Sequence, residues 1–354
     1  MTSWLSYDFD QERPNPMTKM REEIAEIPDA VSRLLSRGAR ANAEAAEAAR
    51  ALGPRFLLSV ARGSSDHVCT YLKYASELIL GRPLASVGPS VRSVYGAELV
   101  ADGALCFSVS QSGQSPDIVQ MTEGLRASGA MTIAITNNAD SRLSAVSDRT
   151  LPIHAGPELS VAATKTFVTS LVSGLWLIAA IKRDEALLQA ILDLPDRLAA
   201  ATECDWSDAA SAMDGRSLFT LGRGPSWAIS NEAALKFKET CLIHAESYSS
   251  AEVLHGPVSI VSEGFPVIAF AAGDAAEASV AETADALAEK GARVFALTDL
   301  ARRATCLPHV RTGHGLTDPS PAIVSCYSLV ETVALSRGID PDTPLHINKV
   351  TETV

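Results

Sequence analysis

The chain has 354 residues, of which 47% are hydrophobic and 20% are charged, a balance that excludes an intrinsically disordered protein. The formal net charge of −12 argues against binding to nucleic acid, because such binding depends on Lys and Arg neutralising phosphates. The length exceeds the usual size of one domain, so we expect two.

The N-terminal segment MTSWLSYDFDQERPNP has no basic stretch followed by an apolar core, so we expect no secretory signal and a cytoplasmic protein. Residues 17–51, rich in Ala and Glu, are predicted to be helical and to form an arm outside the first sheet. The longest apolar stretch, 167–181, is shorter than the roughly 20 residues needed to span a bilayer. We therefore predict a buried helix there and no membrane contact.

An internal repeat organises the rest of the chain. FLLSVARGSSDH at 56–67 matches LFTLGRGPSWAI at 218–229, with Arg62-Gly63 falling on Arg223-Gly224 at an offset of 161 residues. Two further matches have an offset of 162: LCFSVS at 105–110 with VIAFAA at 267–272, and TIAIT at 132–136 with VFALT at 294–298. Three matches at nearly one spacing indicate a duplicated domain.

Each half alternates short apolar runs with longer helical stretches, which is typical of a parallel sheet covered by helices on both faces. We predict an α/β fold of two tandem domains, each an αβα sandwich. The predicted strands are 56–61, 105–110, 132–136, 151–154, 217–222, 266–271, 293–298 and 308–311. The predicted units are an arm at 1–45, a phosphate-binding domain at 46–184, a helical linker at 185–213, a second domain at 214–339 and a tail at 340–354.

A polar loop joins a strand to a helix in the first half. It reads Ser110-Gln111-Ser112-Gly113-Gln114-Ser115, with Ser115 expected as N-cap and Pro116 as first helical residue. Such a junction offers free N–H groups and the positive end of a helix to an anion. Ser64 and Ser65, after the first strand, could close the site, because ligands collect at the carboxyl ends of parallel strands.

The alternative for this loop is that its hydroxyl groups only cap the helix. The repeat favours a phosphate site, because the second copy, at 272–277, has no hydroxyl group and carries two acids. We therefore expect only the first half to bind phosphate.

No cofactor and no metal are expected. Neither copy of the Arg-Gly segment shows the full GxGxxG spacing followed by an acid, which argues against a nicotinamide cofactor. The cysteines form no Cys-x-x-Cys pair, which predicts buried, reduced thiols instead of disulfides or a zinc site. They are Cys69, Cys106, Cys204, Cys241, Cys306 and Cys326.

Groups suited to proton transfer lie in the second half. Glu232, Lys236 and Glu239 are spaced i, i+4 and i+7, so on a helix they lie within about 60° of one another. A carboxylate that moves a proton between adjacent carbons and a cation that holds the enolate oxygen are sufficient for aldose–ketose interconversion. The alternative is a solvated helix face with ordinary ion pairs.

Two further candidates follow. His255 lies in a His-Gly-Pro turn and could serve as an acid or base near neutral pH. Lys349, in the tail LHINKVTETV, could polarise a carbonyl or form a Schiff base. The alternatives are a loop histidine without a role and a frayed chain end.

Together these motifs resemble the SIS (sugar isomerase) family, in particular the isomerase half of glucosamine-6-phosphate synthase and the SIS-type glucosamine-6-phosphate deaminases. The resemblance covers nearly the whole chain. The matching segments, all in family order, are MREEIAEIP, ARGSS, SQSGQSPD, VAATKTF, LGRG, EAALKFKET, IHAES, EVLHGP and NKVTETV.

The resemblance implies a role for each candidate residue. Glu239 would move a proton between C1 and C2 of the sugar, Lys236 would stabilise the enolate oxygen, and Glu232 would support the site. His255, supplied by the neighbouring subunit of a homodimer, would open the sugar ring, and Lys349 would meet the open-chain carbonyl. The phosphate would be held by Ser64, Ser65, Ser110, Gln111, Ser112 and Ser115, and the sugar site lined by Val161 and Ala163.

The chain departs from the synthase at Ala163, where the synthase has serine, and at Asn348, where it has alanine. The chain also starts directly before the helical arm, where the synthase carries its glutamine amidotransferase domain. We therefore expect a deaminase that converts glucosamine 6-phosphate to fructose 6-phosphate and ammonia. The alternatives are an aminotransferase supplied with ammonia or served by a separate glutaminase, a deglycase or isomerase of another sugar phosphate, and a non-enzymatic sugar-phosphate sensor.

Overall fold

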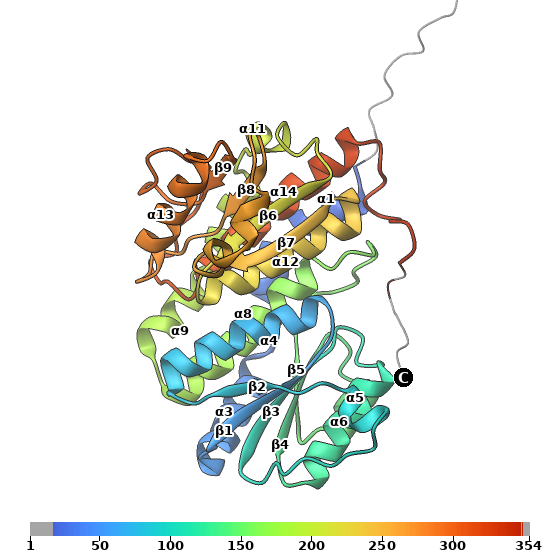
Figure 1. The fold of residues 1–354 in the computed structure, drawn as a ribbon. Coiled ribbons are helices and arrows are strands. Elements are labelled where there is room, and N and C mark those ends of the chain that lie inside the picture. Colours follow the sequence, from blue (N-terminus) through green and yellow to red (C-terminus); the bar gives the residue numbers. More distant parts are fainter. Residues whose placement is uncertain (1–16, 348, 350–354) are drawn as a thin grey trace, which may run out of the picture.

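A computed structural model describes residues 17–347 and residue 349, which form two lobes (Figure 1). Each lobe contains a five-stranded sheet in which all paired strands are parallel. The strand orders are β2-β1-β3-β4-β5 and β7-β6-β8-β9-β10, so the two sheets have the same topology. The first contains β1 (Phe56–Val60), β2 (Leu84–Ser86), β3 (Ala104–Val109), β4 (Met131–Thr136) and β5 (Arg149–Pro152). The second contains β6 (Ser217–Gly222), β7 (His244–Ser249), β8 (Pro266–Ala269), β9 (Arg293–Ala296) and β10 (Thr305–Cys306).

Helices cover both faces of each sheet, which confirms the predicted α/β fold. One hydrophobic core is continuous between the lobes and includes Leu57 and Phe107 of the first sheet and Ile268 of the second. The helices in this shared layer include α4 (Ser64–Ala75), α8 (Lys165–Lys182), α12 (Pro225–Cys241) and α14 (Pro319–Ser336). On the outer faces lie α5 (Ser90–Ser93), α6 (Pro116–Ala127) and α7 (Arg142–Val146) of the first lobe and α13 (Glu277–Ala288) of the second.

Further helices precede and join the two sheets. Helix α1 packs against α14, where Thr18 donates to Glu331 at 2.9 Å and Arg21 forms an ion pair with the same carboxylate. The N-terminal helices thus reach the second lobe although they precede the first sheet. They are α1 (Lys19–Ala25), α2 (Ile27–Arg37) and α3 (Ala39–Leu52); between the sheets lie α9 (Glu185–Leu192), α10 (Leu194–Thr202) and α11 (Ser207–Ala210).

Helix α8 is the one helix of the described residues whose length and composition would allow it to cross a membrane. Within the fold, 78% of its apolar window is buried, and the helix packs against α3, α4 and α2. The prediction of a buried helix at 167–181 is therefore confirmed.

The sequence placed most strands correctly but erred at the sheet edges. The strand predicted at 308–311 is wrong: β10 pairs only at Thr305 and Cys306, and Pro308 follows without an N–H to donate. Strands β2 and β7 were not predicted, since β2 has three residues and β7, HAESYS, is polar. The expected burial of the cysteines holds for four of them, whereas Cys306 is exposed and Cys204 is half-buried.

Candidate active site

Two loops of the first lobe meet where the strand order reverses between β1 and β3, the position at which parallel α/β sheets bind ligands. The first loop leads through Gly63 into α4, and the second leads from Ser110 into α6. The Arg62 side chain joins them, because its Nε donates to Oδ2 of Asp117 at 2.8 Å. The repeat is visible in the backbone: Gly63 (φ 54°, ψ −135°) and Gly224 (φ 59°, ψ −135°) precede α4 and α12 in the same unusual conformation.

The loop at 110–115 is folded by its own hydroxyl groups. Ser110 Oγ accepts from the N–H of Gly113 at 3.2 Å, and Ser112 Oγ accepts from the N–H of Gln114 at 3.3 Å. Ser115 precedes α6, but its hydroxyl makes no capping hydrogen bond. Among the described residues, the N–H groups of Gln111, Ser112 and Ser115 have no acceptor. Helix capping therefore does not account for the loop, which retains donors for an anion.

Gly113 fixes the path of this loop. Its φ of +63° is unfavourable for any residue with a side chain, and a Cβ there would lie 2.2 Å from Ser141 Oγ. Its carbonyl accepts from the N–H of Leu143 at 3.0 Å, which ties the loop to α7. The position therefore requires glycine for both conformational and steric reasons.

In the second lobe, the corresponding loop at 272–277 binds a carboxylate of the same chain. The N–H of Gly273 donates to Oδ2 of Asp318 at 2.7 Å, and the N–H of Thr312 donates to Oδ1 of the same carboxylate at 2.7 Å. Arg311 pairs with Asp318 and with Glu277. The Asp318 carboxylate thus already accepts from the N–H group with which the second loop could begin to bind an anion. This is consistent with phosphate binding by the first half alone.

Helix α12 carries the Glu232, Lys236 and Glu239 side chains predicted to share one face. Lys236 Nζ lies 2.6 Å from Glu239 Oε2 and 3.3 Å from Glu232 Oε1. It also donates to Ser64 Oγ, at the start of α4, at 3.1 Å. The side chains of Glu232 and Lys236 are fully buried, whereas that of Glu239 is 24% exposed. The alternative of a solvated face is therefore excluded, and only Glu239 is open to a ligand.

The electrostatics of this cluster keep the lysine charged. Burial alone would lower the pKa of Lys236, but the carboxylates of Glu232 and Glu239 outweigh it and hold the pKa above its usual range. Burial would likewise raise the pKa of Glu232, but Lys236 and His67 outweigh it and lower that pKa. The site therefore presents a permanent cation beside a partly accessible carboxylate.

Sequence reasoning missed two residues that contact Glu232. His67 Nδ1 lies 2.8 Å from Glu232 Oε2, and the Tyr327 hydroxyl donates to Oε1 at 3.4 Å. His67 also lines a cavity of about 400 Å³ together with Gly63, Asp66 and Lys238. His67 lies one turn into α4, in the segment that identified the repeat, but it contacts a residue 165 positions away that no local pattern indicates.

Lys349 docks on the first lobe. Its Nζ donates to Glu158 Oε2 at 2.8 Å and to the carbonyl of Ser160 at 2.7 Å. Asp342 holds the preceding tail, because its carboxylate accepts from the first N–H groups of α1 at 2.8 Å. Figure 1 shows the chain after α14 running along the second lobe in the direction of the first. These contacts, and not a frayed end, define the position of Lys349; Asn348 lies outside the described residues.

Glu158 organises the loop that contains Val161 and Ala163, both half-buried. Its carboxylate accepts from the N–H groups of Thr164 and Thr166 at 3.0 Å and from the Thr166 hydroxyl at 2.6 Å. Burial would raise the pKa of Glu158, but Lys349 and Thr166 outweigh it and lower that pKa. Glu158 could not be identified from the sequence, because a single acid between two predicted elements forms no recognisable pattern.

One chain therefore brings together only part of the predicted site. Ser64 joins Glu232, Lys236 and Glu239, and Ser65 follows Ser64 in the first turn of α4. His255 ends the short helix η2 (Glu252–His255), is exposed, and makes no hydrogen bond to any described residue. The side chain of His255 thus remains outside the Lys236 cluster of its own chain.

The fold and this cluster define a two-lobed α/β protein with a buried charge cluster beside the first turn of α4. The chain belongs to the SIS domain family, whose family model matches residues 55–180 and 213–333. It is thus a member of a sugar phosphate isomerase family with one SIS domain in each lobe.

Known relatives agree with this assignment. The chain is 33% identical to a glutamine–fructose-6-phosphate aminotransferase (isomerizing) of Pyrobaculum aerophilum, over 84% of this chain and 51% of the relative. It therefore spans about half the length of this curated relative. A crystal structure from Silicibacter pomeroyi, provisionally described as a phosphosugar isomerase, is 63% identical, covers 92% of this chain and all of its own, and has a TM-score of 0.90. A glucosamine-6-phosphate deaminase from Thermotoga maritima, 22% identical over 95% of this chain and 100% of its own with a TM-score of 0.78, shares the fold.

Proposed function

We propose that this protein is a glucosamine-6-phosphate deaminase, which converts glucosamine 6-phosphate and water to fructose 6-phosphate and ammonia. One observation carries the proposal: the buried ammonium of Lys236 contacts both Glu239, at 2.6 Å, and Ser64, at 3.1 Å. A carboxylate that could act as a general base and a buried cation thus lie directly beside the first turn of α4, at the carboxyl end of the first sheet. This combination is sufficient for the enolisation of a sugar phosphate.

The phosphate of the substrate would be held by the loop at 110–115 together with Ser64 and Ser65. Their hydroxyl and N–H groups are neutral donors, and the start of α6 adds the positive end of a helix dipole. A neutral binding loop suits a chain with a net charge of −12, because it binds the anion through local contacts. Val161 and Ala163, in the loop beside Lys349, would line the sugar.

The reaction would begin with opening of the sugar ring by His255 of a second subunit, which makes the working unit a homodimer. Glu239 would then remove the proton from C2 of the open-chain amino aldehyde, while Lys236 stabilises the negative charge on O1. Return of the proton to C1 leaves a hydroxymethyl group at C1 and an imine at C2. Addition of water to the imine and departure of ammonia complete the conversion. Lys349 would bind the open-chain carbonyl, and Glu232 would keep Lys236 charged and in position.

A second candidate is synthesis in the opposite direction, with ammonia as the nitrogen source. The 33% identity to an aminotransferase favours it, and the proton transfers are the same in reverse. We favour release because the imine formed at C2 then needs only water as a co-reactant, and no second nitrogen source has to be supplied.

The test is an assay of ammonia and ketose 6-phosphate formed from glucosamine 6-phosphate, with galactosamine 6-phosphate as the epimeric control. The proposal predicts ammonia and fructose 6-phosphate in equal amounts from glucosamine 6-phosphate. Amino sugar formation from fructose 6-phosphate and ammonia, without measurable release, would establish the synthetic direction instead. Interconversion of other sugar phosphates without ammonia would indicate a plain isomerase, and ligand-induced stabilisation without any product would indicate a sensor.

A further inference from the structure

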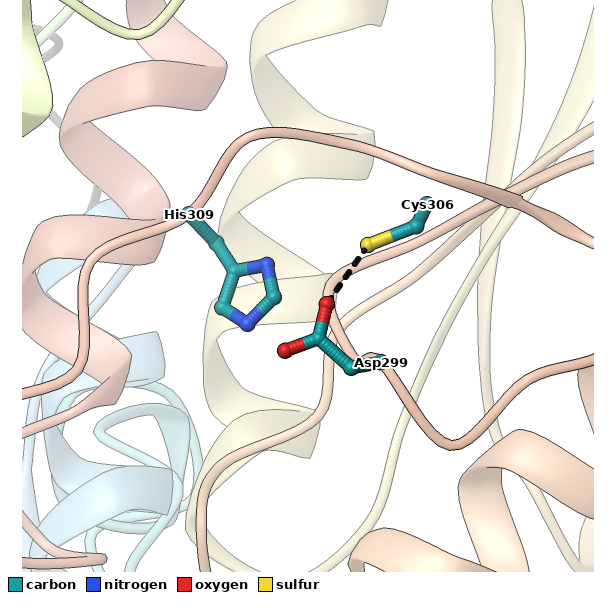
Figure 2. A group of neighbouring side chains, drawn as sticks. All are labelled: Asp299, Cys306 and His309. Atoms are coloured by element: carbon teal, nitrogen blue, oxygen red, sulfur yellow. Dashed lines mark hydrogen bonds between the residues drawn. The ribbon is translucent and has the colours of Figure 1, made fainter.

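Three side chains with metal-binding atoms gather at one edge of the second lobe. Asp299 follows β9, Cys306 ends β10, and His309 comes three residues later. One potential ligand atom from each residue lies within 4.8 Å of the other two (Figure 2). Asp299 and Cys306 are exposed and His309 is half-buried, so an ion could reach them from solvent. None of the three contributes to the candidate active site on α12.

The hydrogen bonds of this cluster arrange its atoms for a cation. Cys306 Sγ donates to Asp299 Oδ1 at 3.3 Å. His309 Nδ1 lies 2.9 Å from the carbonyl oxygen of Leu307, which can only accept, so Nδ1 carries the proton and Nε2 has a free lone pair. Figure 2 shows the imidazole ring turned toward the Asp299 carboxylate. A carbonyl that holds the second ring nitrogen is the usual support of a histidine ligand.

The sequence around these residues also fits a metal site. The chain has no Cys-x-x-Cys pair, but Cys306-Leu307-Pro308-His309 is a Cys-x-x-His segment. Pro308 restricts the backbone between the two side chains, which limits the conformational entropy lost on binding.

We propose that Asp299, Cys306 and His309 bind one divalent zinc ion. Thiolate, imidazole and carboxylate are the ligands that zinc uses in proteins, at distances of roughly 2.0–2.3 Å. The Cys306–Asp299 separation of 3.3 Å already suits two ligands of one tetrahedral ion. The thiol proton leaves to solvent when the sulfur binds the metal, and a water molecule completes the fourth position.

The ion would stabilise the edge of the second sheet that is formed by β10. Strand β10 pairs with β9 at only two positions, Thr305 with Phe295 and Cys306 with Ala296. A bound ion would join the end of β10 to the loop that follows β9, and it would stabilise the folded chain by mass action.

The test uses Co²⁺ as a spectroscopic substitute for zinc, added to the full metal-free chain. We expect one equivalent of Co²⁺ to bind with a thiolate-to-cobalt absorption band, and Zn²⁺ to remove the band by competition. Cys306→Ser and Asp299→Asn should lose this binding, whereas Cys204→Ser, which changes the half-buried cysteine, should retain it. A wild-type chain without the band, or a Cys306→Ser chain that keeps it, would overturn the proposal.

Discussion

Replacing Lys236 with methionine tests the buried charge cluster directly. The change removes the ammonium group but keeps a flexible side chain of similar length. It leaves the Glu232 carboxylate, which is fully buried, without its cationic lysine partner, whereas His67 at 2.8 Å and Tyr327 at 3.4 Å remain. Removing one partner of a buried ion pair typically lowers the free energy of unfolding by about 3–5 kcal/mol. Because His67 remains, we expect a loss of about 3 kcal/mol in the free energy of unfolding at pH 7.

The pH dependence of this loss has a defined sign. In the wild-type protein the pKa of Glu232 lies below its ordinary value of 4.5, so its contribution to stability is present above that pH and disappears as the pH falls through the lowered pKa. In the variant, burial without the lysine raises that pKa, and a protonated Glu232 carries no unpaired charge. The difference between the two proteins should therefore be largest near neutral pH and shrink as the pH approaches 4.5.

The assay is urea-induced unfolding of the wild-type protein, Lys236→Met, and the double variant with Glu232→Gln. The double variant should recover most of the lost stability, because it removes the unpaired charge as well. A Lys236→Met protein as stable as the wild type at pH 7, or a double variant that is no more stable than the single one, would refute this reasoning.

Three further predictions concern the loops and the subunit interface. Gly113→Ala should cost roughly 1–3 kcal/mol of stability, since its Cβ would collide with the Ser141 side chain, whereas Gly88→Ala should be nearly neutral in the same unfolding measurement. Glu158→Gln should cost about 2 kcal/mol at pH 7 and less below pH 4.5, since the lowered pKa of Glu158 makes its contribution disappear in acid; equal losses at both pH values would contradict this. Inactive His255→Asn and Glu239→Gln chains should regain ammonia release when mixed and refolded together, because one site of a mixed dimer is then complete; no recovery would exclude exchange of His255 between subunits.

What the sequence could predict depended on the range of the interaction. The spacing of Glu232, Lys236 and Glu239 fixes their common face through helix geometry alone, and the structure confirms that face. The two parallel sheets could be predicted because each buried strand appears as a short apolar run, and because the repeat shows that the pattern occurs twice. Contacts such as His67 with Glu232 depend on how separate elements pack, and no local pattern encodes them.

The polar edges of the sheets were the other source of error. Strand β7 is half exposed and β10 pairs at only two positions, so neither displays the apolar run that marks a buried strand. The exposed thiol of Cys306 was missed because cysteines are buried more often than not. The contact between Asp318 and the N–H of Gly273 could not be predicted either, because the two residues lie 45 positions apart in the sequence.

In the proposed mechanism, the phosphate loop at 110–115 and the Glu239 carboxylate on α12 act on one sugar phosphate in separate roles. The most direct measurement compares binding and turnover in Glu239→Gln, with glucosamine 6-phosphate affinity measured by calorimetry and ammonia release measured on the same preparation. We expect the affinity to stay within about threefold of the wild type while ammonia release falls by roughly 10²–10⁴-fold, the usual contribution of a general base. Ammonia release at the wild-type rate, or a loss of binding as large as the loss of turnover, would contradict this division of roles.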